Sequence, residues 1–158
     1  DNYGILGSFL GADGKLGPNI TLPCCYISEC DLEKRVHENK KVLWMDGGEV
    51  FKFAVKIMEY ATLKVLEKTN IPLSDIDLIF PHQANIRIIE GAAKRLNLTE
   101  DKVYANVERY GNISSASIPV ALDEASKKGR IKKGDLLVLV GFGGGLTWGS
   151  IVLKWSKE

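Results

Sequence analysis

The stretch DLIFPHQANIRIIEGAAKRL, residues 77–96, changes its hydrophobic pattern halfway along. Its first part is a short apolar run ending at Phe80, which is typical of a buried strand of about residues 76–80. Its second part repeats apolar side chains every three or four residues, the spacing of one helix face: Ile86, Ile89, Ala93 and Leu96. A strand followed directly by a helix predicts a layered α/β domain, and His82 lies in the loop between the two.

The same alternation of helices and short strands continues on both sides of this stretch. Apolar periodicity predicts a helix over about residues 48–68, ended by Pro72, and a third helix over 114–128 with Pro119 in its first turn. The run KVYANV, residues 102–107, predicts a strand between the second and third helices.

Strands are also predicted at both ends of the chain. The alternating run GILGSFLGADG and about residues 19–27 favour two strands near the start. DLLVLVGF and TWGSIVLKW are joined by a glycine-rich turn, so we expect a closing hairpin. Parallel crossovers plus a hairpin give the predicted fold class: α/β, with a layered mixed β-sheet and helices on its faces.

Composition limits the kinds of function open to the chain. Its 158 residues are enough for a single domain over residues 1–158, and 21 Lys and Arg balance 20 Asp and Glu. This balance predicts neither nucleic acid nor an anionic membrane as a partner. No apolar run approaches the roughly 18 residues that span a bilayer, and the first residues lack the pattern of a signal peptide. Cys24, Cys25 and Cys30 are not a disulfide framework, so we expect a soluble protein of the reducing cytoplasm.

Three chemically unusual loops follow three predicted strands. His82 follows the first, Asn112 follows the second, and the GFGGG run, Gly141–Gly145, follows the third. Ligands of such sheets bind at the carboxyl ends of strands, so these loops could share one edge. A neutral imidazole and a carboxamide can both donate a hydrogen bond to one oxygen. Such donors stabilise an enolate or a thioester oxyanion by about 3 kcal/mol each, and Asn112 also precedes a predicted helix amino end.

Each of these residues also has a purely structural interpretation. A histidine after a strand is commonly a hydrogen-bonded structural residue, and an Asn after Gly is typical of a turn or cap. GFGGG lacks the lysine of a phosphate loop and precedes a strand, so its glycines either approach a substrate or make a tight hairpin. The three cysteines and His37 lack the spacing of a metal site, and we predict no metal.

Basic residues gather beside the predicted site. Arg87 and Lys94 lie seven positions apart on the helix after His82, with Arg95 next to them, and Lys52 lies on the preceding helix. A charged helix face is ordinarily a solvated face. Because this face begins directly after His82, it is also a candidate for receiving a phosphate or an acidic carrier protein.

Three segments taken together resemble a known family. FPHQANIRIIEGAAKRL, ERYGNISSASIPVALDEA and GFGGGLTWGS, in that order, resemble the carboxyl-terminal half of β-ketoacyl-acyl carrier protein synthase III, a member of the thiolase-like superfamily. MDGGEVFKFAV resembles the helix before them. The resemblance implies a thiolase-like half and an acyltransferase that starts fatty-acid synthesis by decarboxylative Claisen condensation. An acyl group, typically acetyl, would pass from acyl-CoA to a cysteine and then to malonyl-acyl carrier protein, with coenzyme A thioester as a substrate and no cofactor.

The resemblance also implies roles for individual residues. His82 and Asn112 would hold the malonyl thioester oxygen and stabilise the enolate. Gly144 would offer its backbone N–H to the oxyanion of the acyl-cysteine, and Phe142 would line the same pocket. The positions that would flank the pantetheine arm are Gly47, Phe51, Ala84 and Asn85. The positions that would receive the carrier protein are Arg87, Lys52, Lys94 and Arg95.

One part of the family's site has no match in this sequence. The family's nucleophilic cysteine belongs to the amino-terminal half, and Cys24, Cys25 and Cys30 lie in a stretch that does not match its surroundings. We therefore expect the carboxyl-terminal half of a two-half enzyme, inactive without its own amino-terminal half and homodimeric when complete. Two alternatives remain open: a synthase of secondary metabolism, of polyketide or alkylquinolone type, and a noncatalytic module that binds acyl carrier protein.

Overall fold

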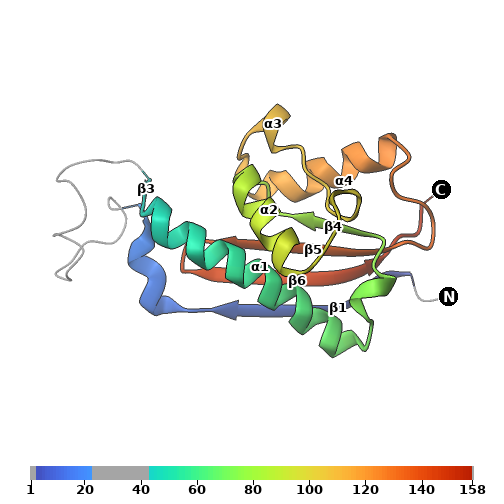
Figure 1. Ribbon diagram of the computed structural model, residues 1–158, viewed down its shortest axis with the longest axis horizontal. Coiled ribbons are helices and arrows are strands. Elements are labelled where there is room, and N and C mark those ends of the chain that lie inside the picture. The colour runs from blue at the N-terminus through green and yellow to red at the C-terminus, as the bar shows by residue number, and fades with distance from the viewer. Residues whose placement is uncertain (1–2, 23–42, 158) are drawn as a thin grey trace.

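A four-stranded sheet with helices on both faces forms the centre of the computed structural model, which describes residues 3–22 and 43–157 (Figure 1). The strand order across the sheet is β1 (Gly4–Ala12), β6 (Thr147–Lys154), β5 (Leu136–Gly143) and β4 (Leu78–Pro81). Both pairings of β6 are antiparallel and β4 is parallel to β5. The prediction of a mixed sheet with a closing hairpin is therefore confirmed. A separate two-stranded sheet pairs β2 (Ile20–Thr21) with β3 (Trp44–Met45).

The helices follow the predicted apolar periodicity. The described residues form four α-helices: α1 (Gly47–Thr69), α2 (Ile86–Arg95), α3 (Val107–Tyr110) and α4 (Ser117–Lys127). Short 3₁₀ turns are η1 (Gly14–Asn19), η4 (Leu73–Asp75), η5 (Glu100–Lys102) and η6 (Ser114–Ala116). Helix α1 begins where the Asp46 carboxylate accepts the Glu49 N–H at 3.0 Å, and it ends at the left-handed Asn70, before Pro72. Within the described ranges, no helix has the length and apolar character that a bilayer crossing requires.

Alternate residues of the central strands bury their side chains on opposite sides of the sheet. On one side, Val138 and Val140 of β5 pack with α1 and α2. On the other side, Leu137 of β5 packs with Ala121 and Ala125 of α4. The period-two pattern of a strand places these neighbours on different faces. The result is three layers, with α1 running along the sheet on one face and α4 lying on the other (Figure 1).

The strand predicted at residues 102–107 is wrong. Only Val103 forms a bridge, in parallel with Ile79, and the next residue donates its N–H to the carbonyl of Ile79 at 2.9 Å. Beyond that point the Gln83 side chain accepts the N–H groups of Asn106 and Val107, at 2.9 and 3.2 Å. Because a side chain takes the donors that a ladder would use, the chain turns into α3 instead.

Two further predictions are met only in part. Of the strand predicted at 19–27, the structure describes Ile20–Thr21 as β2, and residues 23–42 lie outside the described part. Cys24, Cys25, Cys30 and His37 belong to that outside segment. The third helix, predicted from residue 114, begins as the 3₁₀ turn η6 and becomes α-helical at Ser117.

Candidate functional site

His82 lies directly after β4, where the parallel pairing with β5 continues. Its N–H donates to the carbonyl of Val140 at 2.8 Å, and its ring meets the Phe142 ring edge-on, with centroids 5.6 Å apart. A Cβ added at Gly141 would lie 3.6 Å from the Cβ of His82. The ends of the two parallel strands therefore bring His82 and the GFGGG run to one edge of the sheet, as predicted.

The surroundings of His82 favour its neutral form. The side chain is half-buried, and burial lowers the pKa of the imidazole from its ordinary value of 6.5. Its Nδ1 atom lies 2.6 Å from the hydroxyl oxygen of Ser117, the first residue of α4. The imidazole is therefore neutral at neutral pH, and Nε2 is the ring nitrogen left to face a substrate.

Gln83 fixes the loop that carries His82. Its side chain is 1% exposed, and its amide nitrogen donates to the carbonyls of Pro81 and Tyr104 at 2.9 and 3.0 Å. Its amide oxygen accepts the N–H groups of Asn106 and Val107. Both ends of the amide are satisfied, so it joins the end of β4 to the segment that leads towards Asn112. Gln83 was not selected from the sequence. The signal that could have identified it is an amide side chain next to a histidine, directly after a buried strand.

Asn112 follows α3 and not a strand, so its predicted place after a second central strand is wrong. Its Oδ1 accepts the N–H of Ser114 at 3.0 Å, which makes it the turn residue that the structural interpretation expects. The carboxamide nitrogen still carries two N–H donors. Asn112 is exposed and lies five residues before Ser117, the residue that contacts His82. That Asn112 and His82 act on one substrate oxygen stays a prediction.

Glu124 of α4 holds the segment before Asn112 in place. Its carboxylate accepts hydrogen bonds from the Tyr104 hydroxyl at 2.8 Å, Arg109 at 2.7 Å and Lys128 at 2.5 Å. The Lys128 hydrogen bond lowers the pKa of Glu124 to about 2, with smaller contributions from Tyr104, Tyr110 and Asn106. The same helix therefore holds His82 through Ser117 and the segment leading to Asn112 through Glu124.

The glycine-rich run makes the hairpin turn between β5 and β6. β5 ends at Gly143, β6 begins at Thr147, and the Thr147 hydroxyl donates to the Gly144 carbonyl at 3.1 Å. The hairpin interpretation is therefore confirmed, and Gly144 lies exposed at its tip. Whether the Gly144 N–H meets an oxyanion stays a prediction.

An aromatic row extends from His82 across the end of the sheet. Phe142 contacts Phe53 of α1 at a centroid distance of 6.2 Å, and Phe53 contacts Trp148 of β6 at 5.9 Å. Edge-on and tilted contacts of this kind are favourable arrangements of aromatic rings. Sequence reasoning named Phe142 but missed Phe53, which belongs to the periodic segment of α1.

The residues predicted to flank pantetheine lie at the beginnings of two helices. Ala84 and Asn85 form the loop between His82 and α2, where Asn85 caps the helix by accepting the Arg87 N–H at 2.9 Å. Gly47 is the first residue of α1, and Phe51 follows one turn later with 41% of its surface exposed. The two helices pack together, since a Cβ added at Gly91 would lie 3.0 Å from Val55.

The four predicted docking cations differ in their pairing. Arg95 forms an ion pair with Glu59, and Lys52 forms one with Glu49 at 2.8 Å that raises the pKa of the lysine. Arg87 and Lys94 are exposed, and neither forms an ion pair with any residue in the described ranges. Arg87 and Lys94 are therefore the two predicted docking cations whose charge is not offset by a carboxylate of the described residues.

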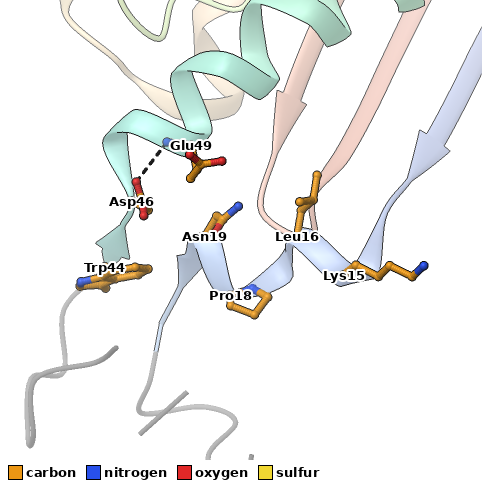
Figure 2. Close-up of a pocket in the computed structure, with 7 residues that line it drawn as sticks. All are labelled: Lys15, Leu16, Pro18, Asn19, Trp44, Asp46 and Glu49. Atoms are coloured by element: carbon orange, nitrogen blue, oxygen red, sulfur yellow. Dashed lines mark hydrogen bonds between the residues drawn. The ribbon is translucent and has the colours of Figure 1, made fainter. Parts of the chain in front are cut away.

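A pocket of about 600 Å³ lies at the amino end of α1 (Figure 2). Its walls come from η1, β3 and the first turn of α1: Lys15, Leu16, Pro18, Asn19, Trp44, Asp46 and Glu49. None of the predicted site residues lines it. We therefore place the chemistry at the ends of β4 and β5. In residues 3–22 and 43–157 there is no cluster of three or more side chains suited to a metal ion.

Comparison with known proteins identifies the family. Residues 66–155, more than half of the chain, match the family model described as 3-oxoacyl-[acyl-carrier-protein (ACP)] synthase III C terminal. The chain belongs to this family. It is 55% identical to β-ketoacyl-[acyl-carrier-protein] synthase III of Caldanaerobacter subterraneus subsp. tengcongensis, covering 98% of this chain and 47% of that protein. It is 50% identical to the synthase III of Desulfitobacterium hafniense, in a match that covers 100% of this chain and 48% of that protein.

Solved structures of synthase III enzymes share the fold. The Thermus thermophilus enzyme superimposes with a TM-score of 0.91 at 46% identity, covering 100% of this chain and 48% of that one. The Aquifex aeolicus enzyme superimposes with a TM-score of 0.84 at 39% identity, covering 98% and 46%. The predicted thiolase-like α/β fold is therefore confirmed. The chain spans about half the length of the curated relatives that it matches.

Proposed function

We propose that this chain supplies the carboxyl-terminal half of a β-ketoacyl-acyl carrier protein synthase III, which condenses acyl-CoA with malonyl-acyl carrier protein to start fatty-acid synthesis. Membership of the synthase III family supports this activity. The observation that carries it is the position of His82: a half-buried imidazole at the ends of two parallel strands, kept neutral by burial and packed against Phe142. A neutral imidazole N–H can stabilise an enolate without neutralising it by proton transfer.

In the proposed reaction His82 and Asn112 act on the malonyl thioester. The bond between the malonyl carboxylate and its neighbouring carbon breaks, carbon dioxide leaves, and the electron pair passes to the thioester oxygen as an enolate. The imidazole N–H of His82 and the carboxamide N–H of Asn112 donate to that oxygen. The enolate carbon then attacks the acyl-cysteine carbonyl, whose oxyanion accepts the Gly144 N–H in a pocket lined by Phe142, and the cysteine thiolate leaves.

We assign the substrate arm and its carrier to the starts of α1 and α2. Gly47, Phe51, Ala84 and Asn85 flank pantetheine in this proposal, because they lie at the amino ends of α1 and α2. Arg87 and Lys94 offer unpaired positive charge to an acidic carrier protein. Lys52 and Arg95 are weaker candidates, since Glu49 and Glu59 already occupy them.

We propose that a second α/β unit, the amino-terminal half, provides the nucleophilic cysteine and covers the open part of the sheet. Ile5 and Leu10 of β1 are 66% and 76% exposed. They share a face with Leu153 and Gly149 of β6, on the side of the sheet away from α1. A covering unit would remove these two exposed apolar side chains from water. The complete enzyme in this proposal is a cytoplasmic homodimer that uses coenzyme A thioesters as substrates and has no resident cofactor.

Malonyl decarboxylation by the full-length enzyme tests the catalytic assignment. His82→Ala and Asn112→Ala should each lower the rate by about 100-fold or more, because each removes one oxyanion donor. Asn97→Gly is the matched control: it removes an exposed carboxamide at a left-handed position that glycine tolerates. Rates close to wild type in both alanine variants would refute the assignment.

Condensation by the 158-residue chain alone tests the two-half organisation. We expect none, since the proposed nucleophile belongs to the other half. An acyl group found by mass spectrometry on Cys24, Cys25 or Cys30, together with product formation, would contradict this expectation.

A further inference from the structure

The hydroxyl of Ser117 lies between two polar groups of the loop after β4. Its oxygen is 2.6 Å from Nδ1 of His82 and 3.3 Å from the backbone nitrogen of Gln83. The residue is 2% exposed, so the hydroxyl has little access to water. Its three possible hydrogen bonds, one donated and two accepted, must therefore be satisfied by the protein or a buried water.

These two contacts distinguish the tautomers of His82. The Gln83 N–H can only donate, so it occupies one lone pair of the serine oxygen. With the proton of His82 on Nε2, the serine hydroxyl donates to Nδ1 and its oxygen accepts the Gln83 N–H, so the buried hydroxyl hydrogen has an acceptor. With the proton on Nδ1, the serine oxygen accepts from both neighbours, and its own buried hydrogen has no acceptor among the contacts of the described residues. A buried donor without a partner is costly, so the first arrangement is favoured.

We propose that Ser117 is a positioning residue: its hydroxyl donates to Nδ1 of His82 and holds the imidazole as the Nε2–H tautomer, with the N–H directed to substrate. This inference rests on the proposed function for the identity of that substrate, a malonyl thioester whose oxygen receives the N–H. The opposite tautomer would present a lone pair to the same oxygen and repel it. Ser117 acts through His82 and does not itself touch the reacting atoms.

The position of Ser117 in the fold supports this role. It is the first residue of α4, and Ala121 and Ala125, one and two turns later, are fully buried against the sheet. The loop on the other side is held by the four hydrogen bonds of the Gln83 amide. Serine and histidine are therefore both fixed by packed elements, which is what a defined tautomer and ring orientation require.

Nuclear magnetic resonance on the full-length enzyme, with ¹⁵N-labelled histidine, measures the tautomer directly. The His82 signals are assigned by their loss in His82→Gln. We expect two-bond correlations at neutral pH to show a protonated Nε2 and an unprotonated Nδ1 in the wild type. In Ser117→Ala we expect the Nδ1 resonance to shift or broaden as its donor is lost. A wild-type ring protonated at Nδ1 would overturn the inference, whatever the variants do.

Malonyl decarboxylation kinetics provide the second measurement. Ser117→Ala should lower kcat about tenfold with KM nearly unchanged, because one positioning hydrogen bond is lost. Ser117→Thr retains the hydroxyl and should recover most of kcat, and Ser126→Ala, elsewhere on the same helix, should leave it unchanged. Thermal melting verifies that each variant is folded. If Ser117→Thr does not fold, the tautomer of His82 measured in the wild-type enzyme tests the inference. An undiminished kcat in folded Ser117→Ala would also overturn the inference.

The two proposals fail in different ways. If His82→Ala abolishes decarboxylation but the wild-type His82 is protonated at Nδ1, the proposed function stands and the proposed role of Ser117 is refuted. A wild-type enzyme with Nε2 protonated but without activity on malonyl thioesters loses the proposed function.

Discussion

The carboxylate of Glu124 accepts a hydrogen bond from the hydroxyl of Tyr104 at 2.8 Å, and the tyrosine backbone in turn donates to Ile79 of β4. Helix α4 and strand β4 are thereby joined through a residue that belongs to neither. The phenol ring also stacks on Phe80, with centroids 5.4 Å apart, directly before the loop that carries His82. The geometry of the candidate site therefore depends on an ionised carboxylate some distance from it.

We predict that Glu124→Gln lowers the free energy of unfolding by about 1 kcal/mol at neutral pH, because the ionised acceptor of four hydrogen bonds is lost. The pKa of Glu124 is lowered to about 2 from its ordinary 4.5, so its stabilisation is present above 4.5 and is lost as pH falls towards 2. Urea unfolding of both proteins over this range should show the difference shrinking with acidity. Asp123→Asn is the control, since that side chain is 62% exposed against 10% for Glu124. A difference independent of pH would contradict the assignment.

The buried amide of Gln83 leads to a second prediction. Gln83→Leu should lower the free energy of unfolding by about 2 to 4 kcal/mol, because it removes the partner of two backbone N–H groups and two carbonyls. Gln83→Glu keeps the shape but replaces the donors facing Pro81 and Tyr104 with an acceptor, so it should be destabilising too. Chemical denaturation measures the free energy of unfolding of both variants. A decrease below about 0.5 kcal/mol in each would show that the loop does not depend on the Gln83 amide for its structure.

Glycines in the sheet lead to a third prediction, on packing. Gly11→Ala should destabilise the fold by about 1 to 3 kcal/mol, since the new Cβ would lie 2.4 Å from the ring of Trp148. Gly14→Ala is the matched control, because no atom lies within 4 Å of its Cβ. Gly141→Ala should also fold, as its nearest contacts are ordinary ones at 3.6 Å. Equal melting temperatures for all three variants would refute this account of Gly11.

Hydrophobic periodicity was sufficient for the elements whose side chains pack by their own pattern. Helices α1 and α2 and the β5–β6 hairpin lie where the apolar spacing predicted them. The approach of His82 to the GFGGG run was also predictable, because parallel strands place their carboxyl ends together. Local pattern and tertiary packing agree in these segments.

Hydrogen bonds between distant residues explain what the sequence pattern could not predict. Residues 102–107 alternate like a strand, but the Gln83 amide, 23 positions earlier than Asn106, takes their donors. Ser117 lies 35 positions after the histidine that it contacts. Nothing in the local sequence distinguishes such a serine from the others near it. These two side chains were found only from the fold.

The lowered pKa of His82 leads to a fourth prediction. Burial lowers the pKa below its ordinary 6.5, so between the two values the unfolded chain binds more protons and stability rises with pH. The free energy of unfolding therefore decreases as the pH falls below 6.5, and His82 makes no such contribution above pH 6.5. In His82→Gln the loss of stability between about pH 7 and pH 5 should be smaller than in the wild type. His37→Gln, the other histidine of the chain, is the control. Parallel stability curves for wild type and His82→Gln would contradict the burial argument.

The proposed docking of a carrier protein leads to the last prediction, which compares two arginines of α2. Arg87 forms no ion pair within the described ranges, whereas Arg95 is paired with Glu59. Arg87→Glu in the full-length enzyme should raise KM for malonyl-acyl carrier protein about five- to tenfold, and added salt should reduce this difference because exposed charges are screened. Arg95→Glu should raise KM less while lowering stability, since it leaves two carboxylates facing each other. KM values for acyl-CoA serve as the control in both variants. An unchanged KM for the carrier substrate in Arg87→Glu would remove this face of α2 from the docking surface.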